Sequence, residues 1–151
     1  PHTGGGMNIE ALYDEWSPRL LPYMITITRD RHKAEDALQE LFVNLARSQP
    51  RMEDPAVYLF RAARNEALRV SRRRPECPLA TLDVLSSDDP AEAAEVAEAL
   101  DSLPPEQSEI VVLHVFQGRS FREIGAILGI PQDTAASRYR YALAKLQERL
   151  G

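Results

Sequence analysis

Polar side chains of the kinds that hydrogen-bond to nucleic acid recur at helical spacing near the end of the chain. They are Gln132, Thr134, Ser137, Arg138, Tyr141 and Lys145. Arginine can bind a guanine edge through two donors, whereas serine and threonine more often contact phosphate. Spacings of three and four place most of these side chains on one face of a helix. The pattern therefore predicts a helix that contacts duplex DNA.

A tight turn separates this helix from an earlier one. Residues 120–123 read Ser-Phe-Arg-Glu, the pattern of a capping box that starts a helix. Gly129 suits the turn, and Pro131 suits the first turn of the second helix. The inward seam of that second helix is expected to be Ala135, Tyr139, Ala142, Leu146 and Leu150. Two short helices joined in this way predict a helix-turn-helix, whose second helix enters the major groove.

Other polar residues of this half are interpreted as structural. Arg140 and Arg149 are expected on a solvated helix face. His114 lies in the apolar run 110–116, so we expect it to pack or to bond a backbone carbonyl rather than to bind a ligand.

The net charge of −5 is unusual for a DNA-binding protein, but the acidity belongs to one segment. Residues 7–75 hold 12 Lys and Arg against 10 Asp and Glu, and residues 103–151 hold 6 against 5. Residues 76–102 hold 8 acidic residues and no basic one. Both flanking segments are therefore slightly basic.

The acidic segment divides the chain. It begins with prolines and a Ser-Ser-Asp-Asp-Pro cluster that has too little apolar content to fold alone, so residues 76–95 are interpreted as a linker. Residues 91–100 become rich in Ala and Glu and are expected to be helical, with Val96, Leu100 and Leu103 packing on the C-terminal unit. An all-α protein of two small domains follows, residues 7–75 and 96–151.

The N-terminal half is helical by periodicity. Residues 8–16 open one helix, and Ser17-Pro18 offers a start for a second that runs to Thr28, with a kink expected at Pro22. From residue 31 to 47, apolar side chains recur on one face: Ala34, Leu38, Leu41, Phe42 and Leu45. The other face carries Glu35, Asp36, Gln39 and Glu40. We therefore expect an amphipathic helix with an acidic edge.

A further helix starts at Asp54-Pro55. Its inward side chains are expected to be Tyr58, Leu59, Ala62, Ala63 and Leu68, and its outer side carries Arg61, Arg64, Arg69, Arg72, Arg73 and Arg74. We therefore expect a helix with a basic outer side.

Several classes of function are excluded. The three His are scattered and Cys77 is the only cysteine, so neither a catalytic cluster nor a metal site is indicated, and no cofactor is expected. No apolar run approaches membrane-spanning length, which favours a cytoplasmic protein without membrane insertion. Residues 1–6 are interpreted as a cloning remnant before a native Met7.

Three segments of the N-terminal half resemble region 2, the promoter-melting domain, of bacterial group IV or extracytoplasmic-function sigma factors. They are residues 19–21, 33–42 and 58–65. The C-terminal helix-turn-helix resembles region 4 of the same family. The two resemblances occur in the family's order, and a short acidic linker stands where larger sigma factors carry another domain.

The resemblance implies a role for each part. The edge formed by Asp36, Gln39 and Glu40 would dock on the clamp helices of the polymerase β′ subunit, and region 4 would read the upstream promoter element as duplex and touch the β flap. The loop 48–54 would capture a flipped-out base of the melted strand, which costs a few kcal/mol of unstacking. The melted strand would contact Arg51, Tyr58, Arg61, Arg64, Asn65, Arg69 and Arg72. An anti-sigma factor is a further expected partner.

Tyr58 stands where the family usually has Trp, and the residues leave open whether its ring is core or a base contact. Two other functions also stay open. The segment 103–150 resembles the DNA-binding domain of response regulators, which would make a stand-alone helix-turn-helix regulator that dimerises. A sigma-like decoy that only binds an anti-sigma factor is the second alternative.

Overall fold

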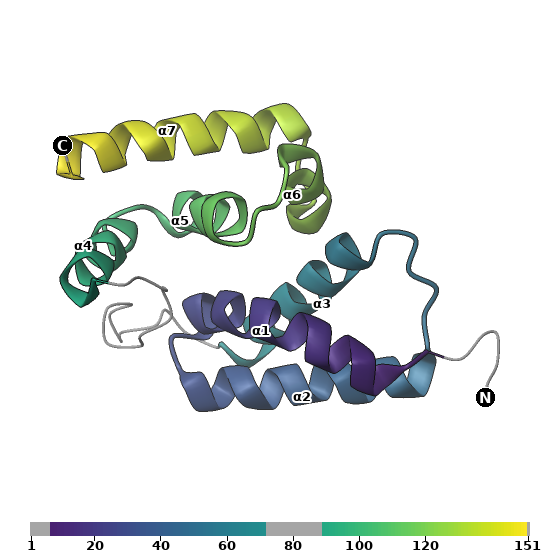
Figure 1. Ribbon diagram of the computed structural model, residues 1–151. Coiled ribbons are helices and arrows are strands. Elements are labelled where there is room, and N and C mark those ends of the chain that lie inside the picture. Colours follow the sequence, from purple (N-terminus) through teal and green to yellow (C-terminus); the bar gives the residue numbers. More distant parts are fainter. Residues whose placement is uncertain (1–6, 72–88, 151) are drawn as a thin grey trace.

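The computed structural model describes residues 7–71 and 89–150. Three helices form the N-terminal domain: α1 (Ile9–Thr28), α2 (Arg31–Ser48) and α3 (Pro55–Val70). Figure 1 shows α1 and α2 side by side along the lower edge, with α3 crossing them toward the rest of the chain. No strand occurs in the described ranges, as the sequence predicts.

Each of these helices begins at a polar capping residue. The side chains of Asn8, Asp30 and Asp54 accept hydrogen bonds from backbone N–H groups of the first turns, at 3.0, 3.1 and 3.3 Å. Such caps satisfy donors that have no partner within the helix. The predicted start of α3 at Asp54-Pro55 is confirmed.

The prediction of two helices before Thr28 is wrong, because α1 is continuous across Pro18 and Pro22. A proline inside a helix removes one backbone hydrogen bond and crowds the preceding turn. Burial of Trp16, Leu20 and Tyr23 against α2 and α3 offsets this cost and keeps the helix in one piece.

The ring of Phe60 lies at the centre of the N-terminal core and is fully buried. Trp16 and Tyr23 approach it edge-on, with ring centroids 6.4 and 5.6 Å away. Edge-to-face contacts of this kind add to the free energy gained from burying the rings. The predicted apolar face of α2 is buried as expected, but Leu68 of α3 is 46% exposed, so its predicted inward position is wrong.

The C-terminal domain contains five helical segments: α4 (Pro90–Asp101), α5 (Pro105–Val111), the π-helical turn η2 (Val112–Phe116), α6 (Phe121–Leu128) and α7 (Gln132–Leu150). In Figure 1, α7 lies along the top, over α5 and beside α6. Residues 90–95, which the sequence analysis placed in the linker, are the first turns of α4, and residues 76–88 lie outside the described ranges. Leu100 and Leu103 are buried and Val96 packs against the same core, as predicted.

The start of α6 and the turn between α6 and α7 contain the predicted capping and turn residues. Ser120 and Glu123 form a capping box, in which each side chain accepts a hydrogen bond from the other residue's backbone N–H, at 3.1 and 2.9 Å. Gly129 ends α6 with φ of 73°, in the left-handed region that glycine adopts without strain. Gly125 lets the chain return closely, because a Cβ there would lie 2.7 Å from the carbonyl oxygen of Ile130. The helix-turn-helix is therefore built as predicted, except that Pro131 stands immediately before α7 rather than in its first turn.

The predicted inward side chains of α7 are confirmed for all but the last one, Leu150. Ala135 and Ala142 are buried, and Tyr139 and Leu146 pack against the core. Leu150 is 42% exposed, so its predicted inward position is wrong.

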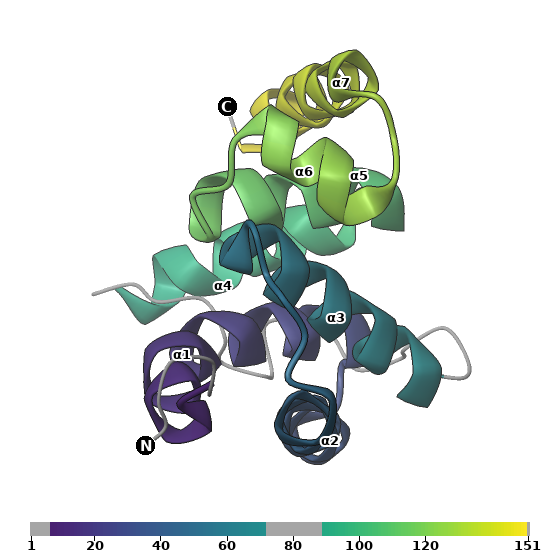
Figure 2. The ribbon, with the colours of Figure 1, turned by 90° about the vertical axis from the view of Figure 1, so that its right-hand side faces the viewer.

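The two domains pack against each other, and one cluster of buried side chains continues through both. The main contact is between α3 and α6. Figure 2 shows α3 between the α1–α2 pair below and the C-terminal helices above. The arrangement leaves α7 on the side of the molecule away from α1 and α2 (Figures 1 and 2).

Candidate nucleic-acid and polymerase interfaces

The acidic edge of α2 lies on the surface of the N-terminal domain. Asp36, Gln39 and Glu40 are all exposed, at the three- and four-residue spacings that place them on one side of the helix. The opposite side of α2 carries the buried residues that hold it on α1 and α3. A fixed helix therefore presents two carboxylates and an amide together, which suits a basic protein surface and would repel a phosphate backbone.

The polar residues of α3 divide between two faces of the helix. Tyr58 faces the groove toward α2, whereas Arg61 and Arg64 reach toward the C-terminal domain. Arg69, further along, donates two hydrogen bonds to Oε1 of Glu66, at 2.9 and 3.1 Å. The sequence analysis treated these arginines as one outer side, and the structure separates them.

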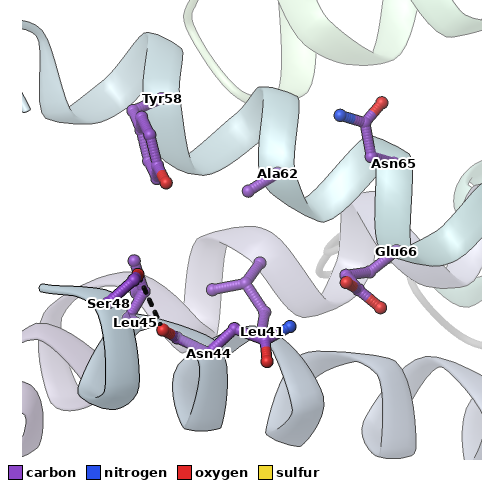
Figure 3. A pocket seen from close by; sticks show the side chains of 8 residues that line it. All are labelled: Leu41, Asn44, Leu45, Ser48, Tyr58, Ala62, Asn65 and Glu66. Carbon is purple, nitrogen blue, oxygen red and sulfur yellow. Dashed lines mark hydrogen bonds between the residues drawn. The ribbon is translucent and has the colours of Figure 1, made fainter. Parts of the chain in front are cut away.

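The groove between α2 and α3 contains a cavity of about 200 Å³. In Figure 3, Tyr58 and Ala62 project from α3 toward Leu41, Asn44, Leu45 and Ser48 of α2, with Glu66 at one end. The amide of Asn65, which also borders the cavity, points away from α2. Ser48, the last residue of α2, donates a hydrogen bond to the carbonyl oxygen of Asn44 at 2.9 Å. The loop 49–54 leaves the helix at this point.

This cavity combines an apolar floor with a polar rim. Leu41, Leu45 and Ala62 supply the floor, and hydroxyl, amide and carboxylate groups stand around it. Tyr58 is 37% exposed, so its ring is partly available to a ligand rather than enclosed in the core. The cavity is smaller than a site for a drug-sized molecule, which is about 300–1,000 Å³.

The second face of α3 is engaged by the C-terminal domain. Nε of Arg64 donates to Oε2 of Glu109 at 2.7 Å, and the hydroxyl of Tyr23 donates to the same oxygen at 2.5 Å. Arg61 donates to the carbonyl oxygen of Ala126 at 3.3 Å. Two arginines predicted to bind melted DNA are thus hydrogen-bonded within the protein.

Burial and charge shift two pKa values in this cluster. Burial raises the pKa of the Tyr23 hydroxyl well above its usual range, and the neighbouring Glu109 carboxylate raises it further. Burial alone would lower the pKa of the Arg64 guanidinium, but the hydrogen bond and charge of Glu109 outweigh this effect and raise it. Tyr23 is therefore a neutral donor and Arg64 a cation, both directed at one carboxylate.

Glu109 and Tyr23 are functional candidates that the sequence analysis missed. Glu109 immediately precedes the apolar run that begins at Ile110. A carboxylate next to buried residues is costly unless it is paired, so its position indicates that a donor or cation lies nearby. The sequence gives no indication that the partners come from α1 and α3.

The predicted DNA-binding residues of α7 lie at the outer side of the C-terminal domain. Gln132 and Lys145 are exposed and Tyr141 is 66% exposed, whereas Thr134, Ser137 and Arg138 are half-buried. Arg140 donates a hydrogen bond to Oγ of Ser137 at 3.1 Å, and Arg149 pairs with Glu98 at 3.5 Å. The structure therefore brings the six predicted residues to one accessible helix.

An aromatic cluster holds α7 on the preceding helices. His114 stacks on Phe121 with ring centroids 4.4 Å apart and meets Tyr139 edge-on at 4.6 Å. Its Nδ1 lies 2.8 Å from the carbonyl oxygen of Arg119, which confirms the prediction that His114 packs and bonds a backbone carbonyl. The cluster fixes the angle at which α7 leaves the turn.

Two of the remaining predicted residues have different outcomes. Arg51 is exposed in the loop between α2 and α3, and it follows Ser48, a lining residue of the cavity, by three positions in the chain. Arg72, with Arg73 and Arg74, lies outside the described residues.

Over the described ranges, no group of three or more His, Cys, Asp and Glu is placed to hold a metal ion. No helix in those ranges has both the length and the apolar character needed to cross a bilayer.

Comparison with known proteins identifies both domains. The family described as Sigma-70 region 2 matches residues 12–75, and that described as Sigma-70, region 4 matches residues 99–148. The RNA polymerase sigma factor CarQ of Myxococcus xanthus is 32% identical over 94% of this chain and 88% of its own. The chain belongs to the extracytoplasmic-function sigma factors. This sigma factor is a transcription initiation factor that binds core RNA polymerase and recognises promoter DNA.

A second relative has a similar extent. The ECF RNA polymerase sigma factor SigL of Mycobacterium tuberculosis is 28% identical over 92% of this sigma factor and 86% of its own chain. The match to both sigma regions selects an initiation factor over the stand-alone helix-turn-helix regulator, which would have no region 2.

Two solved structures share the fold. A sigma factor RpoE from Bartonella quintana, in complex with the anti-sigma factor NepR, superposes with a TM-score of 0.75 at 24% identity, covering 95% of this sigma factor and 96% of that chain. CnrH, in complex with the cytosolic domain of CnrY, gives a TM-score of 0.72 at 24% identity, covering 94% and 86%.

Proposed function

We propose that this sigma factor divides promoter recognition among three of its surfaces. The acidic edge of α2 (Asp36, Gln39, Glu40) docks on the β′ clamp of core polymerase. The groove between α2 and α3 holds an unpaired base of the melted strand. The outer face of α7 reads the upstream element as duplex, while region 4 touches the β flap.

The cavity between α2 and α3 carries this proposal. It has about 200 Å³ of space, a tyrosine ring at its edge and polar groups on its rim, and the loop 49–54 leads directly from it. Stacking on an aromatic ring stabilises an unpaired base whatever its identity. Hydrogen bonds from the polar groups around the cavity can select among bases. Arg51, Arg61, Arg64, Arg69 and Arg72 would bind the backbone of the same strand.

Asn44 and Glu66, whose side chains point into the space between α2 and α3, are the proposed source of base preference. An amide offers both a donor and an acceptor, whereas a carboxylate only accepts. A base that presents an exocyclic amino group would therefore be favoured over one that presents only carbonyl oxygens at that edge.

An abasic substitution in the melted strand tests the pocket directly. Reconstituted holoenzyme is assayed for run-off transcription on a promoter with one base of the downstream element removed, with wild-type protein and with Tyr58→Ala. If the pocket binds that base, its removal lowers transcription by the wild type but has little added effect on Tyr58→Ala. Leu68→Ala is the matched control, because it truncates an exposed apolar side chain of the same helix outside the cavity.

Equal, additive losses from the abasic site and from Tyr58→Ala at every position of the element would contradict the assignment. Full activity of Tyr58→Ala on intact promoter would also contradict it.

We also propose that the protein has no catalytic role of its own and acts in the cytoplasm, where the polymerase works. An anti-sigma factor is a proposed partner, since the two structurally similar sigma factors were solved with NepR and with CnrY. One result would favour the decoy function over this proposal. It is tight binding to an anti-sigma factor without any transcription in the presence of core polymerase.

A further inference from the structure

One side of α7 packs on the rest of region 4. Ala135 and Ala142 are buried, and Tyr139 and Leu146 pack against the same core. Successive members are spaced by four, three and four residues, so they form one line along the helix, which we call the packed line. In Figures 1 and 2, no other helix of the described ranges lies above α7. The side opposite the packed line is therefore available to a partner.

A second line of side chains lies on nearly the opposite side of α7. It consists of Asp133, Ser137 and Arg140, which we call the outer line. Each of these residues precedes a member of the packed line by two positions. Two positions turn a side chain by about 200° around a helix, because each residue contributes about 100°. Asp133 and Arg140 are exposed and Ser137 is half-buried, as this placement requires.

Most of the other predicted DNA-binding residues lie beside the outer line. They are Thr134, Arg138, Tyr141 and Lys145. Each precedes a member of the packed line by one position, a rotation of only about 100°. When a helix lies in the major groove, its outermost line faces the base edges and its flanks face the phosphates of the groove walls. The outer line is therefore the part of α7 that comes closest to the bases.

The charges of the outer line favour base edges over phosphates. Asp133 lies in the first turn of α7, and its carboxylate would repel a phosphate backbone. A carboxylate can instead accept a hydrogen bond from a base amino group, and an arginine can donate two hydrogen bonds to O6 and N7 of guanine. A line that carries both charges therefore suits base edges, whereas a line of cations alone would suit the backbone.

Ser137 holds the Arg140 side chain in place. Nη2 of Arg140 donates a hydrogen bond to Oγ of Ser137 at 3.1 Å, one turn earlier on the same line. An arginine side chain has many rotamers, so a contact that restricts it before binding lowers the entropy lost in the complex. A guanidinium has more donors than the two that a guanine edge requires, so this bond does not prevent a base contact.

We propose that Arg140 reads a guanine of the upstream element and that Ser137 is its positioning residue. The sequence pattern assigns Arg140 to a solvated face, but its place on the outer line directs it into the groove. This inference rests on the proposed function in one respect, the reading of the upstream element by α7.

Run-off transcription with reconstituted holoenzyme tests the role of Arg140. The templates carry every base pair at each position of the upstream element, in a promoter that the holoenzyme has selected from a random library. The wild type should prefer guanine at one position by about tenfold, and Arg140→Ala should lose this preference while it keeps the preferences at other positions. Arg140→Gln should change the preferred base there from guanine to adenine, because glutamine pairs with N6 and N7 of adenine.

Arg149→Ala is the matched control, since it removes the same charge from the same helix at a residue that pairs with Glu98. It should keep the preference for guanine.

The positioning role of Ser137 has its own readout. Ser137→Ala removes the acceptor that restricts Arg140, so the preference for guanine should weaken at the same position. Ser137→Thr retains a hydroxyl and should restore the preference. A loss in Ser137→Ala that is equal for every template would overturn the positioning role.

The remaining outcomes separate this inference from the proposed function. If Arg140→Ala lowers transcription equally from all templates, Arg140 contacts phosphate and the inference is overturned. If neither Arg140 variant changes any preference, the inference is overturned while the reading of the upstream element by α7 stands. Equal transcription by the wild type from every upstream sequence would contradict the proposed function itself, and the inference with it.

Discussion

Nε of Arg64 donates a hydrogen bond to Oε2 of Glu109 across 2.7 Å, and this bond joins two domains through residues 45 positions apart in the chain. The same carboxylate oxygen accepts from the hydroxyl of Tyr23. A cation and a neutral donor from two helices of region 2 thus converge on one acidic side chain of region 4. Glu109 is therefore one of the contacts that join region 4 to region 2.

Tyr23→Phe should destabilise the protein by about 1–3 kcal/mol, because it removes the buried donor and leaves the Glu109 carboxylate with fewer partners. The ring itself is retained, so its contact with Phe60 is preserved. Urea unfolding measures the change in the free energy of unfolding. Tyr13→Phe is the control, since Tyr13 is an exposed tyrosine of the same helix. Equal stability of the two variants would mean that the hydroxyl contributes nothing.

The same residue predicts a dependence on pH. Because the folded state raises the pKa of Tyr23, the neutral hydroxyl is favoured by folding. Its stabilising effect is complete below the unfolded pKa of about 10 and is lost as the pH rises toward the folded pKa. Unfolding free energies measured from pH 8 to 11 should fall more steeply for the wild type than for Tyr23→Phe. Parallel curves would contradict the assignment.

Charge reversal at Asp36 and Glu40 to Lys should abolish association with core polymerase, because two favourable pairings become repulsions on a surface that must be basic. The DNA contacts of region 4 should be unchanged. A pull-down with core polymerase measures the association. Reversal of Asp14 and Glu15, two exposed residues of α1, is the control with the same change in net charge. Normal binding by the Asp36 and Glu40 variant would show that this edge is not the docking surface.

Arg138→Ala should leave polymerase association intact and cost about 1–3 kcal/mol at the upstream element if the guanidinium reads a base edge. Run-off transcription on variants of the upstream element measures this loss. A base contact predicts that the loss is confined to one position, whereas a phosphate contact weakens all sequences about equally. Arg149→Ala, at the far end of α7, should have little effect on either measure.

Gly125→Ala should destabilise region 4 by about 1–3 kcal/mol, because the added Cβ would meet the carbonyl oxygen of Ile130 at 2.7 Å. Ile130 also donates its N–H to the carbonyl of Gly125 at 2.9 Å, so the turn has little room to shift. Thermal unfolding measures the loss. Wild-type stability of the variant would mean that the turn between α6 and α7 adapts freely.

Local signals predict much of this fold. The Asp54-Pro55 start of α3, the capping box at Ser120 and the turn at Gly129 depend on residues within a few positions of each other, and each is observed. The apolar face of α2 follows from periodicity alone. Features of this kind are set by nearby residues and can be read in order along the chain.

The remaining features depend on contacts distant in sequence. Two prolines indicate a helix break before Thr28, yet packing on α2 and α3 keeps α1 continuous. The arginines of α3 read as one basic surface, but Glu109 and Ala126 of region 4 occupy two of them. The cavity between α2 and α3 is likewise a product of two helices, and no single segment of the sequence indicates its size.

The central claim, that one chain recruits polymerase and opens a promoter, is tested most directly by permanganate footprinting. Permanganate reacts with unpaired thymines and not with paired ones, so it reports where the duplex is melted. The template is a promoter selected from a random library by the reconstituted holoenzyme. We predict reactive thymines in the downstream element only when this sigma factor and core polymerase are both present, and weak or no binding by the sigma factor alone. Tight, sequence-specific duplex binding by the free protein, with no melting when core polymerase is added, would contradict the account.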